Sequence, residues 1–218
     1  MQESFSFPFH TTYLMQLNKS LYYRAIAITG VLAFVLAVAC FLLGNQELFL
    51  LLNGNGGLLL DYFFTIVTTL GEAAAWVVTI VLFIIYKRKL LPLCLLTLII
   101  STTIAQGIKR ALPEQARPSK AFVDASMYHT AKGTDLHKVN SFPSGHTTAA
   151  FSVFLIGCLV VANRWFLVVG LIYALLVAYS RIYLAQHFPK DIAGGMFAAI
   201  AATSLALWIQ ELINKRSK

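Results

Sequence analysis

Six long apolar stretches constrain the fold of this chain more than any other feature of its sequence. Each is roughly as long as the 20 or so helical residues that cross a bilayer core of about 30 Å. They cover residues 25–43, 62–86, 90–107, 145–162, 165–183 and 192–210. Charged residues make up only 12% of the 218 residues, against about 25% in a soluble domain. The sequence predicts an all-α integral membrane protein, with about six transmembrane helices in one bundle and a single domain over residues 1–218.

Three parts of this layout are irregular. Gly71-Glu72 interrupts the stretch 62–86, so the part before Gly71 can also be a separate interfacial helix, with the span starting near Glu72. Residues 45–61 contain several glycines and asparagines that interrupt a helix, so we expect an interfacial segment there and not a span. Residues 1–24 mix aromatic and polar side chains and are expected to be interfacial or flexible. The stretch 25–43 has no cleavage signature and is interpreted as a retained span.

The basic residues suggest how the chain is oriented in its membrane. The first loop between spans carries Glu47 and Asp61 but no lysine or arginine. On the opposite side lie Lys19, Arg24, Lys87, Arg88, Lys89, Arg164, Lys215, Arg216 and Lys218. Positive loops stay in the cytoplasm, so we expect a multi-pass plasma membrane protein, from a bacterial inner membrane, with both termini cytoplasmic. The same distribution explains the net charge of +8, and nucleic acid is not an expected partner.

A first polar motif, Pro143-Ser144-Gly145-His146, opens one of the apolar stretches. Serine is a good N-cap and glycine permits close approach of the backbone, so the free N–H groups of a helix start can face an anion. His146 would lie in the first turn and could donate a proton to that anion. The alternative is a plain N-cap beside a solvated histidine.

A second motif runs from Ser180 to Asp191 between two apolar stretches. Pro189 suits the first position of a helix, which puts Asp191 in its first turn, pointing back toward His187. An imidazole held by a carboxylate at one nitrogen presents the other as a nucleophile. Arg181 lies inside the end of its span and needs an anionic partner, and its guanidinium matches phosphate oxygens. The alternatives are an interfacial histidine with a capping aspartate, and an arginine that reaches the headgroups.

A third cluster, Lys109-Arg110 with Arg117-Pro118, follows another apolar stretch. By itself such a cluster often binds anionic lipid headgroups. Lys109 and Arg110 point about 100° apart on a helix, so only one can face a given site. The three clusters lie at the ends of spans on the outer face of the predicted membrane protein. They can converge on one site, and their residue types suit a phosphate group.

These motifs, in this order, resemble the type 2 phosphatidic acid phosphatase superfamily, whose signatures are Lys-x6-Arg-Pro, Pro-Ser-Gly-His and Ser-Arg-x5-His-x3-Asp. The second and third are matched without deviation. In the first, seven residues separate Lys109 from Arg117, one more than the pattern, while the regular spacing falls on Arg110. We favour Lys109 with a one-residue bulge before Arg117.

The resemblance implies roles for particular residues. His187 would be the nucleophile that forms a phosphohistidine, Asp191 its orienting partner and His146 the acid that protonates the leaving group. The phosphoryl oxygens would be held by Lys109, Arg117, Ser144, Gly145 and Arg181. Cations and helix-end amides can stabilise phosphoryl transfer, and no metal or other cofactor is expected.

The expected function is a membrane lipid phosphatase with its active site at the outer face. Its substrate, and its partner besides the bilayer, would be undecaprenyl pyrophosphate, lipid A, phosphatidic acid or phosphatidylglycerol phosphate. A lipid-to-lipid phosphotransferase would use the same residues, and a transporter is an alternative from another class. The oligomeric state is open. A metal site at His129, Asp135 and His137 is a weak hypothesis, Glu72 could support the site, and His10 has no partner in the sequence.

Overall fold

The computed structural model describes residues 17–71, 73–161 and 163–216. Helices and turns are the only regular elements in this part of the chain. The long helices are α1 (Lys19–Leu43), α5 (Leu91–Ala111), α8 (Phe166–Tyr183) and α9 (Pro189–Arg216). The shorter ones are α2 (Asn45–Leu52), α3 (Gly57–Thr69), α4 (Ala73–Tyr86), α6 (Pro118–Ala121) and α7 (Gly145–Val160), with 3-10 turns η1 (Arg88–Leu90) and η2 (Ala125–Met127).

The helix lengths match a membrane protein, although not as six uniform spans. Among the described residues, four helices are long and apolar enough to cross a bilayer: α1, α5 with η1, α8 and α9. The pair α2 and α3 passes the same test together but is bent by 116° at its break, which gives up to five spans. The apolar helices α4 and α7 are shorter, with 14 and 16 residues.

The stretch 62–86 is not one continuous helix, so its prediction as a single span is wrong and the alternative of two helices is right. Helix α3 ends at Thr69 and α4 begins at Ala73. Gly71, between them, packs so closely that a Cβ atom there would lie 2.5 Å from Val177 Cγ1 and 3.0 Å from the Cβ of His146. The chain therefore turns at a glycine that touches another helix start.

The break predicted within residues 45–61 is confirmed, and a polar contact holds it. Helix α2 ends at Leu52, and the side chain of Asn53 donates hydrogen bonds to the carbonyl oxygens of Ile182 and Tyr183 at 2.8 and 3.0 Å. Its Oδ1 atom accepts a hydrogen bond from the N–H of His129 at 2.6 Å. The break between α2 and α3 is thereby tied to the end of α8 and to the long loop before α7.

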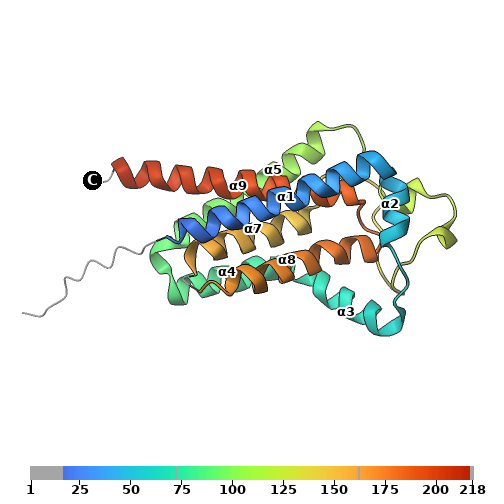
Figure 1. The fold of residues 1–218 in the computed structure, drawn as a ribbon, viewed down its shortest axis with the longest axis horizontal. Helices are drawn as coiled ribbons and strands as arrows, with labels where there is room; N and C mark the ends of the chain where they lie inside the picture. The colour runs from blue at the N-terminus through green and yellow to red at the C-terminus, as the bar shows by residue number, and fades with distance from the viewer. Residues whose placement is uncertain (1–16, 72, 162, 217–218) are drawn as a thin grey trace, which may run out of the picture.

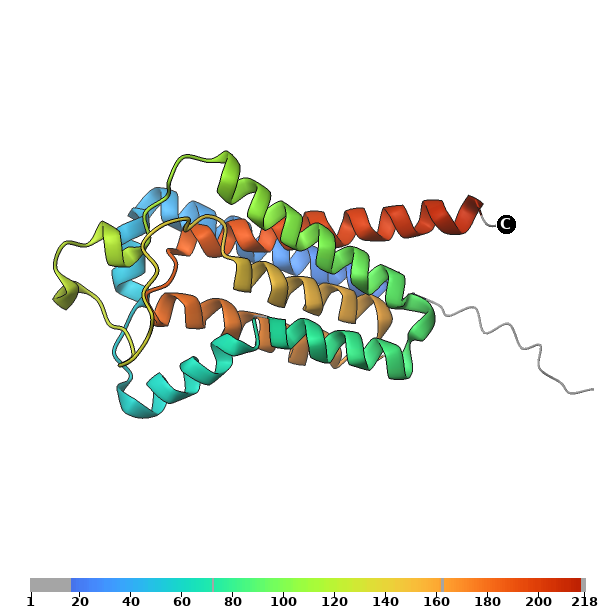
Figure 2. The same ribbon diagram turned by 180° about the vertical axis from the view of Figure 1, so that it is seen from behind.

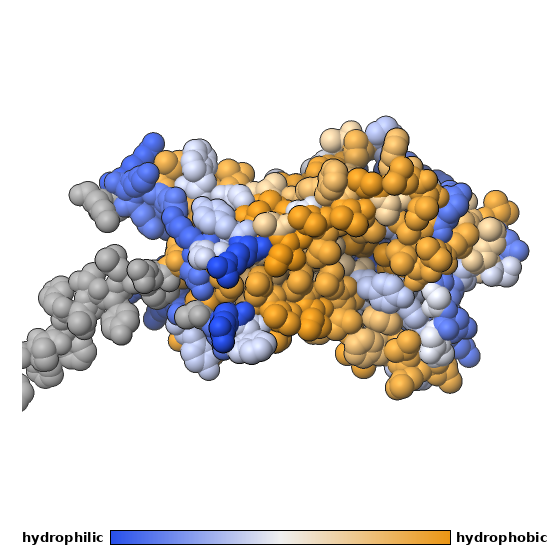
Figure 3. All heavy atoms as spheres, in the orientation of Figure 1, coloured by the Kyte–Doolittle hydropathy of each residue, from blue (hydrophilic) through white to orange (hydrophobic). Residues whose placement is uncertain are grey.

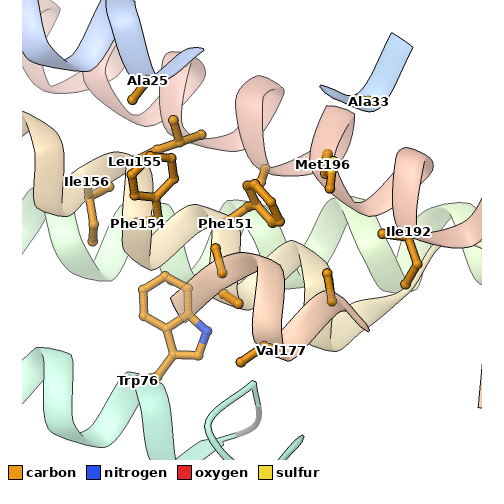
Figure 4. Close-up of a cluster of buried hydrophobic side chains, with 14 of the residues drawn as sticks. Ala25, Ala33, Trp76, Phe151, Phe154, Leu155, Ile156, Val177, Ile192 and Met196 are labelled. Carbon is orange, nitrogen blue, oxygen red and sulfur yellow. The ribbon is translucent and has the colours of Figure 1, made fainter. Parts of the chain in front are cut away.

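Helix α7 lies at the centre of the bundle, with α1, α5, α8 and α9 around it (Figures 1 and 2). Phe151, Phe154 and Leu155 of α7 are fully buried and pack among side chains of neighbouring helices, including Trp76 and Met196 (Figure 4). A helix that is apolar on all sides belongs in a core. Because α7 is central, residues of several surrounding helices can contact its first turn.

The outside of the molecule carries an apolar belt between two hydrophilic ends (Figure 3). Among the described residues, large apolar side chains such as Phe41 and Leu59 are 87% and 81% exposed, as lipid-facing residues are. At one end lie the C-terminal ends of α5 and α8, the N-terminal ends of α7 and α9, and the loop 112–144 (Figures 1 and 2). The chain's C-terminus lies at the other end. All three polar clusters therefore meet at one end of the bundle.

Candidate active site

A cavity of about 500 Å³ opens where the three polar clusters meet. Among the side chains and backbone that line it are Lys109, Arg117, Gly145, His146, Arg181 and His187. Ser144 and Asp191 are both fully buried and do not line the cavity. Six of the eight predicted site residues thus border one hollow, and the other two lie directly behind it.

His187 and Asp191 form the centre of this arrangement. The Nδ1 atom of His187 lies 3.5 Å from Oδ2 of Asp191. The same carboxylate oxygen accepts hydrogen bonds from Phe188 N–H at 2.9 Å and from the hydroxyl of Ser141 at 2.5 Å. With Nδ1 turned to the carboxylate, Nε2 of His187 is the nitrogen available to a ligand in the cavity.

The local sequence explains why these two residues meet. Helix α8 ends at Tyr183, and the N–H groups of Gln186 and His187 both donate to the carbonyl oxygen of Arg181, at 2.9 and 3.0 Å. This closes a tight turn that holds His187 beside Arg181. Pro189 then starts α9, since proline needs no hydrogen bond at the first helical position, and Asp191 in the first turn suits the helix dipole.

Ser141 is a site residue that sequence reasoning missed. It is fully buried, donates to Asp191 and lies 3.5 Å from Nδ1 of His187 through its Oγ atom. Its neighbour Ser144 caps α7, because its hydroxyl accepts hydrogen bonds from Thr147 N–H at 3.4 Å and from Thr147 Oγ1 at 3.0 Å. No local pattern distinguishes Ser141 from other loop serines. Its importance depends on a contact across 50 residues of chain.

Three cations border the cavity. Arg117 is 7% exposed and donates from Nε to the carbonyl of Val139 at 2.9 Å and from Nη1 to that of Gln186 at 3.1 Å. Lys109 donates from Nζ to the carbonyl of Asn140 at 3.0 Å. Arg181 is 6% exposed, and its Nη1 atom donates to the hydroxyl of Thr68. They come from α5, the loop and α8, and all three are oriented by neutral oxygen atoms.

Burial and this positive charge act together on His187, which lies in the turn between α8 and α9. Burial, followed by Arg117, Arg181 and Lys109, lowers the pKa of His187 well below its ordinary value, because each disfavours the charged imidazolium. The imidazole is therefore neutral at neutral pH. A neutral ring is the form that can attack phosphorus.

Helix α3 also contributes to the cavity, which the sequence did not indicate. Thr65, Thr68 and Thr69 line it, at positions that share one face of a helix. In the sequence these threonines belong to a stretch that reads as a membrane span. Only the break after α3 turns their face toward His146.

Several other candidates lie away from the cavity or outside the described residues, although Asp135 and His137 of the metal hypothesis do line it. Arg110 does not line it, so Lys109 is the member of that pair that reaches it. His129 pairs with Asp61, at 2.8 Å between Nε2 and Oδ1. Within residues 17–71, 73–161 and 163–216, no group of three His, Cys, Asp or Glu could hold a metal ion. Glu72 and His10 lie outside the described residues.

The comparisons with known proteins agree with this geometry. The sequence profile of the PAP2 superfamily matches residues 90–215. This chain belongs to the PAP2 superfamily. It is 30% identical to an undecaprenyl-diphosphatase of Sulfolobus acidocaldarius, over 76% of this chain and 78% of that protein. It is 29% identical to a lipid A 4'-phosphatase of Porphyromonas gingivalis, over 70% and 66% of the two chains.

The PAP2 fold is also evident from a solved structure. The crystal structure of Aquifex aeolicus LpxE superposes with a TM-score of 0.65 at 28% identity, covering 75% of this chain and 94% of that one. The family, the all-helical membrane fold and the phosphatase activity predicted from the sequence are thus confirmed. The roles of the individual site residues in this PAP2 protein are proposals.

Proposed function

We propose that this PAP2 protein removes a phosphoryl group from a membrane lipid through a phosphohistidine at His187. The observation that carries the proposal is the meeting of His187, His146 and three cations around one cavity, at the end of the bundle where the apolar belt stops (Figure 3). A lipid in the bilayer would present its phosphate at that level. The cations match the charge of the phosphate, and the histidines supply a nucleophile and an acid.

The reaction would proceed in two displacements. Nε2 of His187 attacks phosphorus while the bond to the lipid oxygen breaks. His146, protonated once the negatively charged phosphate offsets the cations of the cavity, gives that oxygen a proton. Lys109, Arg117 and Arg181 balance the charge on the phosphoryl oxygens. His146, now a base, then takes a proton from water, whose oxygen attacks phosphorus and releases inorganic phosphate from His187. Asp191 and Ser141 hold the ring of His187 in place throughout.

We further propose that the substrate is a lipid phosphate or diphosphate of the outer leaflet, with polyprenyl diphosphates and lipid A as the first candidates. The relatives named as undecaprenyl-diphosphatase and lipid A 4'-phosphatase support these classes. The loop charges support an orientation with both termini in the cytoplasm. The site would then open to the outer or periplasmic side of the plasma membrane.

The test is phosphate release by the purified, detergent-solubilised protein from a panel of lipid monophosphates and diphosphates, with His187→Ala as its companion. We expect release from at least one lipid in the panel, and a loss of more than about 10³-fold in the variant, as for removal of other nucleophiles. Full release by His187→Ala, or none from any lipid by the native chain, would refute the proposal.

A chelator arm belongs to the same assay. Lys109, Arg117 and Arg181 line the cavity together with one carboxylate of the described residues, Asp135, so the positive charge prevails, which suits phosphate oxygens and repels a metal cation. We expect phosphate release to be unchanged after chelation. Strict dependence on added Mg²⁺ with the lipid substrate would count against the phosphohistidine route.

A further inference from the structure

A second hollow, here called the basic groove, lies beside the catalytic cavity. It has a volume of about 600 Å³ and is formed by the C-terminal end of α5 and the loop residues that precede α7. Residues that border both hollows are Gln106, Lys109, Arg117 and His137. Residues that border the basic groove and not the catalytic cavity include Arg110, Lys138 and Asn140. The two hollows therefore adjoin at Lys109 and Arg117.

The basic groove has positive charge that no neighbouring carboxylate neutralises. Its one acidic residue, Glu114, is paired with Lys120. In the described part of the chain, neither Arg110 nor Lys138 forms an ion pair with a carboxylate, and both are exposed. A concave surface lined by positive charges attracts anions, and arginine matches phosphate oxygens especially well.

The basic groove and helix α3 border different parts of the catalytic cavity, the first toward water and the second toward lipid. Lys109 and Arg117 donate to the carbonyl oxygens of Asn140 and Val139, which fixes them between the two hollows. Elsewhere the catalytic cavity is bordered by α3, which also carries exposed apolar side chains, with Leu59 and Ile66 81% and 66% exposed. Inorganic phosphate released from His187 can therefore pass Lys109 and Arg117 into the basic groove, whereas the lipid product leaves past α3.

We propose that the basic groove is a binding site for inorganic phosphate on its way from the catalytic cavity to water, with Arg110 and Lys138 as its ligands. The reason for phosphate to be present there rests on the proposed phosphatase function. The same chemistry would suit the second phosphate of a lipid diphosphate. The experiment therefore separates the two sources.

The direct test measures, by calorimetry at low ionic strength, the binding of inorganic phosphate to the full-length protein in detergent. The variant is Arg110→Gln with Lys138→Gln, and the matched control is Lys132→Gln with Lys89→Gln, two exposed lysines that line neither hollow. We expect phosphate affinity, and inhibition of lipid hydrolysis by added phosphate, to weaken about tenfold in the variant. In the control both should stay within about twofold, and high salt should remove the difference because it screens exposed charges.

Unchanged phosphate affinity in a variant whose thermal midpoint matches the native protein would overturn the proposal. The second arm compares kcat/KM for a lipid diphosphate and a lipid monophosphate. If the variant keeps the native kcat/KM for both lipids, the result supports a product site. If its kcat/KM falls only for the diphosphate, the groove binds the substrate and the proposal is overturned. If the native chain releases no phosphate from any lipid but the variant still loses phosphate binding, the proposed function is refuted and the phosphate site in the basic groove is supported.

Discussion

Ser141 shows how much of this site depends on one buried hydroxyl. Its Oγ atom donates to Asp191 at 2.5 Å and lies 3.5 Å from the ring of His187. Asp191 is fully buried, and loss of that donor leaves its Oδ2 atom with only the N–H of Phe188 and the ring of His187. Such a loss costs about 1–3 kcal/mol. We infer that Ser141 is a positioning residue, which acts on the substrate only through His187 and Asp191.

The prediction for Ser141→Ala is a split between kinetic constants. We expect kcat to fall about 10-fold to 100-fold because the imidazole is less well held, while KM changes by less than about threefold because no phosphate ligand is lost. Steady-state phosphate release measures both. Ser119→Ala is the matched control, since its hydroxyl donates only to the carbonyl of His137. Native kcat in Ser141→Ala would show that the contact has no catalytic value.

The lowered pKa of His187 leads to a second prediction at the residue scale. An ordinary histidine, with a pKa of about 6.5, is mostly protonated at pH 6. Because burial, Arg117, Arg181 and Lys109 lower the pKa of His187, its neutral form persists below pH 6, and the nucleophile is not lost there. Nitrogen NMR of ¹⁵N-histidine-labelled protein, assigned with His187→Ala, measures this directly. Half protonation of His187 at pH 6.5 or above would contradict it.

At the scale of elements, α9 and α7 approach each other through glycine. A Cβ atom on Gly195 would lie 2.8 Å from the carbonyl oxygen of Ser144 and 2.9 Å from Cβ of Thr147. The N–H of Ser144 donates to the carbonyl oxygen of Asp191 at 2.9 Å. The start of α7, with His146, is therefore held in register with the start of α9, with Asp191, by close backbone contact.

Gly195→Ala should disturb this register. Backbone atoms cannot move aside as a flexible side chain can, so we expect a loss of about 1–3 kcal/mol in stability and a fall of about tenfold in kcat. Thermal unfolding and phosphate release measure the two effects. Gly107→Ala in α5 is the control, because among the described residues nothing beyond its chain neighbours and its own helix backbone lies within 4 Å of its Cβ position, and alanine favours a helix. Equal behaviour of the two variants would refute the role assigned to the α7–α9 contact.

The helices and the site could be predicted from the sequence only where their signals are local. The apolar stretches and the three motifs predicted the helices and the meeting of Lys109, His146, Arg181 and His187, because those signals are local. The contributions of α3 and of Ser141 could not be predicted. They depend on the turn at Gly71 and on a loop that folds back onto α9, and both are consequences of tertiary packing.

For the whole molecule, the apolar belt shows which part lies in the membrane, and the charges at the two ends carry the proposed orientation. The site and the loop 112–144 lie at one end of the bundle and η1 at the other (Figures 1 and 2). If the basic residues 87–89 and 215–216 are cytoplasmic, the site end faces outward. The native cysteines Cys94 and Cys158 are buried and Cys40 is partly buried, so background labelling from them should be low.

Orientation can be measured by labelling single added cysteines in intact cells. We expect a maleimide that cannot cross the membrane to label Ser126→Cys, in the loop at the site end, and not Lys89→Cys, at the other end, until the cells are broken. The parent chain, without an added cysteine, is the control. The reverse pattern would place the site in the cytoplasm and would contradict the proposed outer-leaflet substrate.

The central claim is that the cavity positions His187 to accept a phosphoryl group. It is tested most directly by rapid quenching of the purified protein with a ³²P-labelled lipid phosphate, followed by mapping of the labelled peptide. The account predicts an acid-labile label on His187, which Ser141→Ala reduces in rate and His187→Ala abolishes. Phosphate release with no protein-bound label in the native chain at any quench time, or a label on His146, would contradict it.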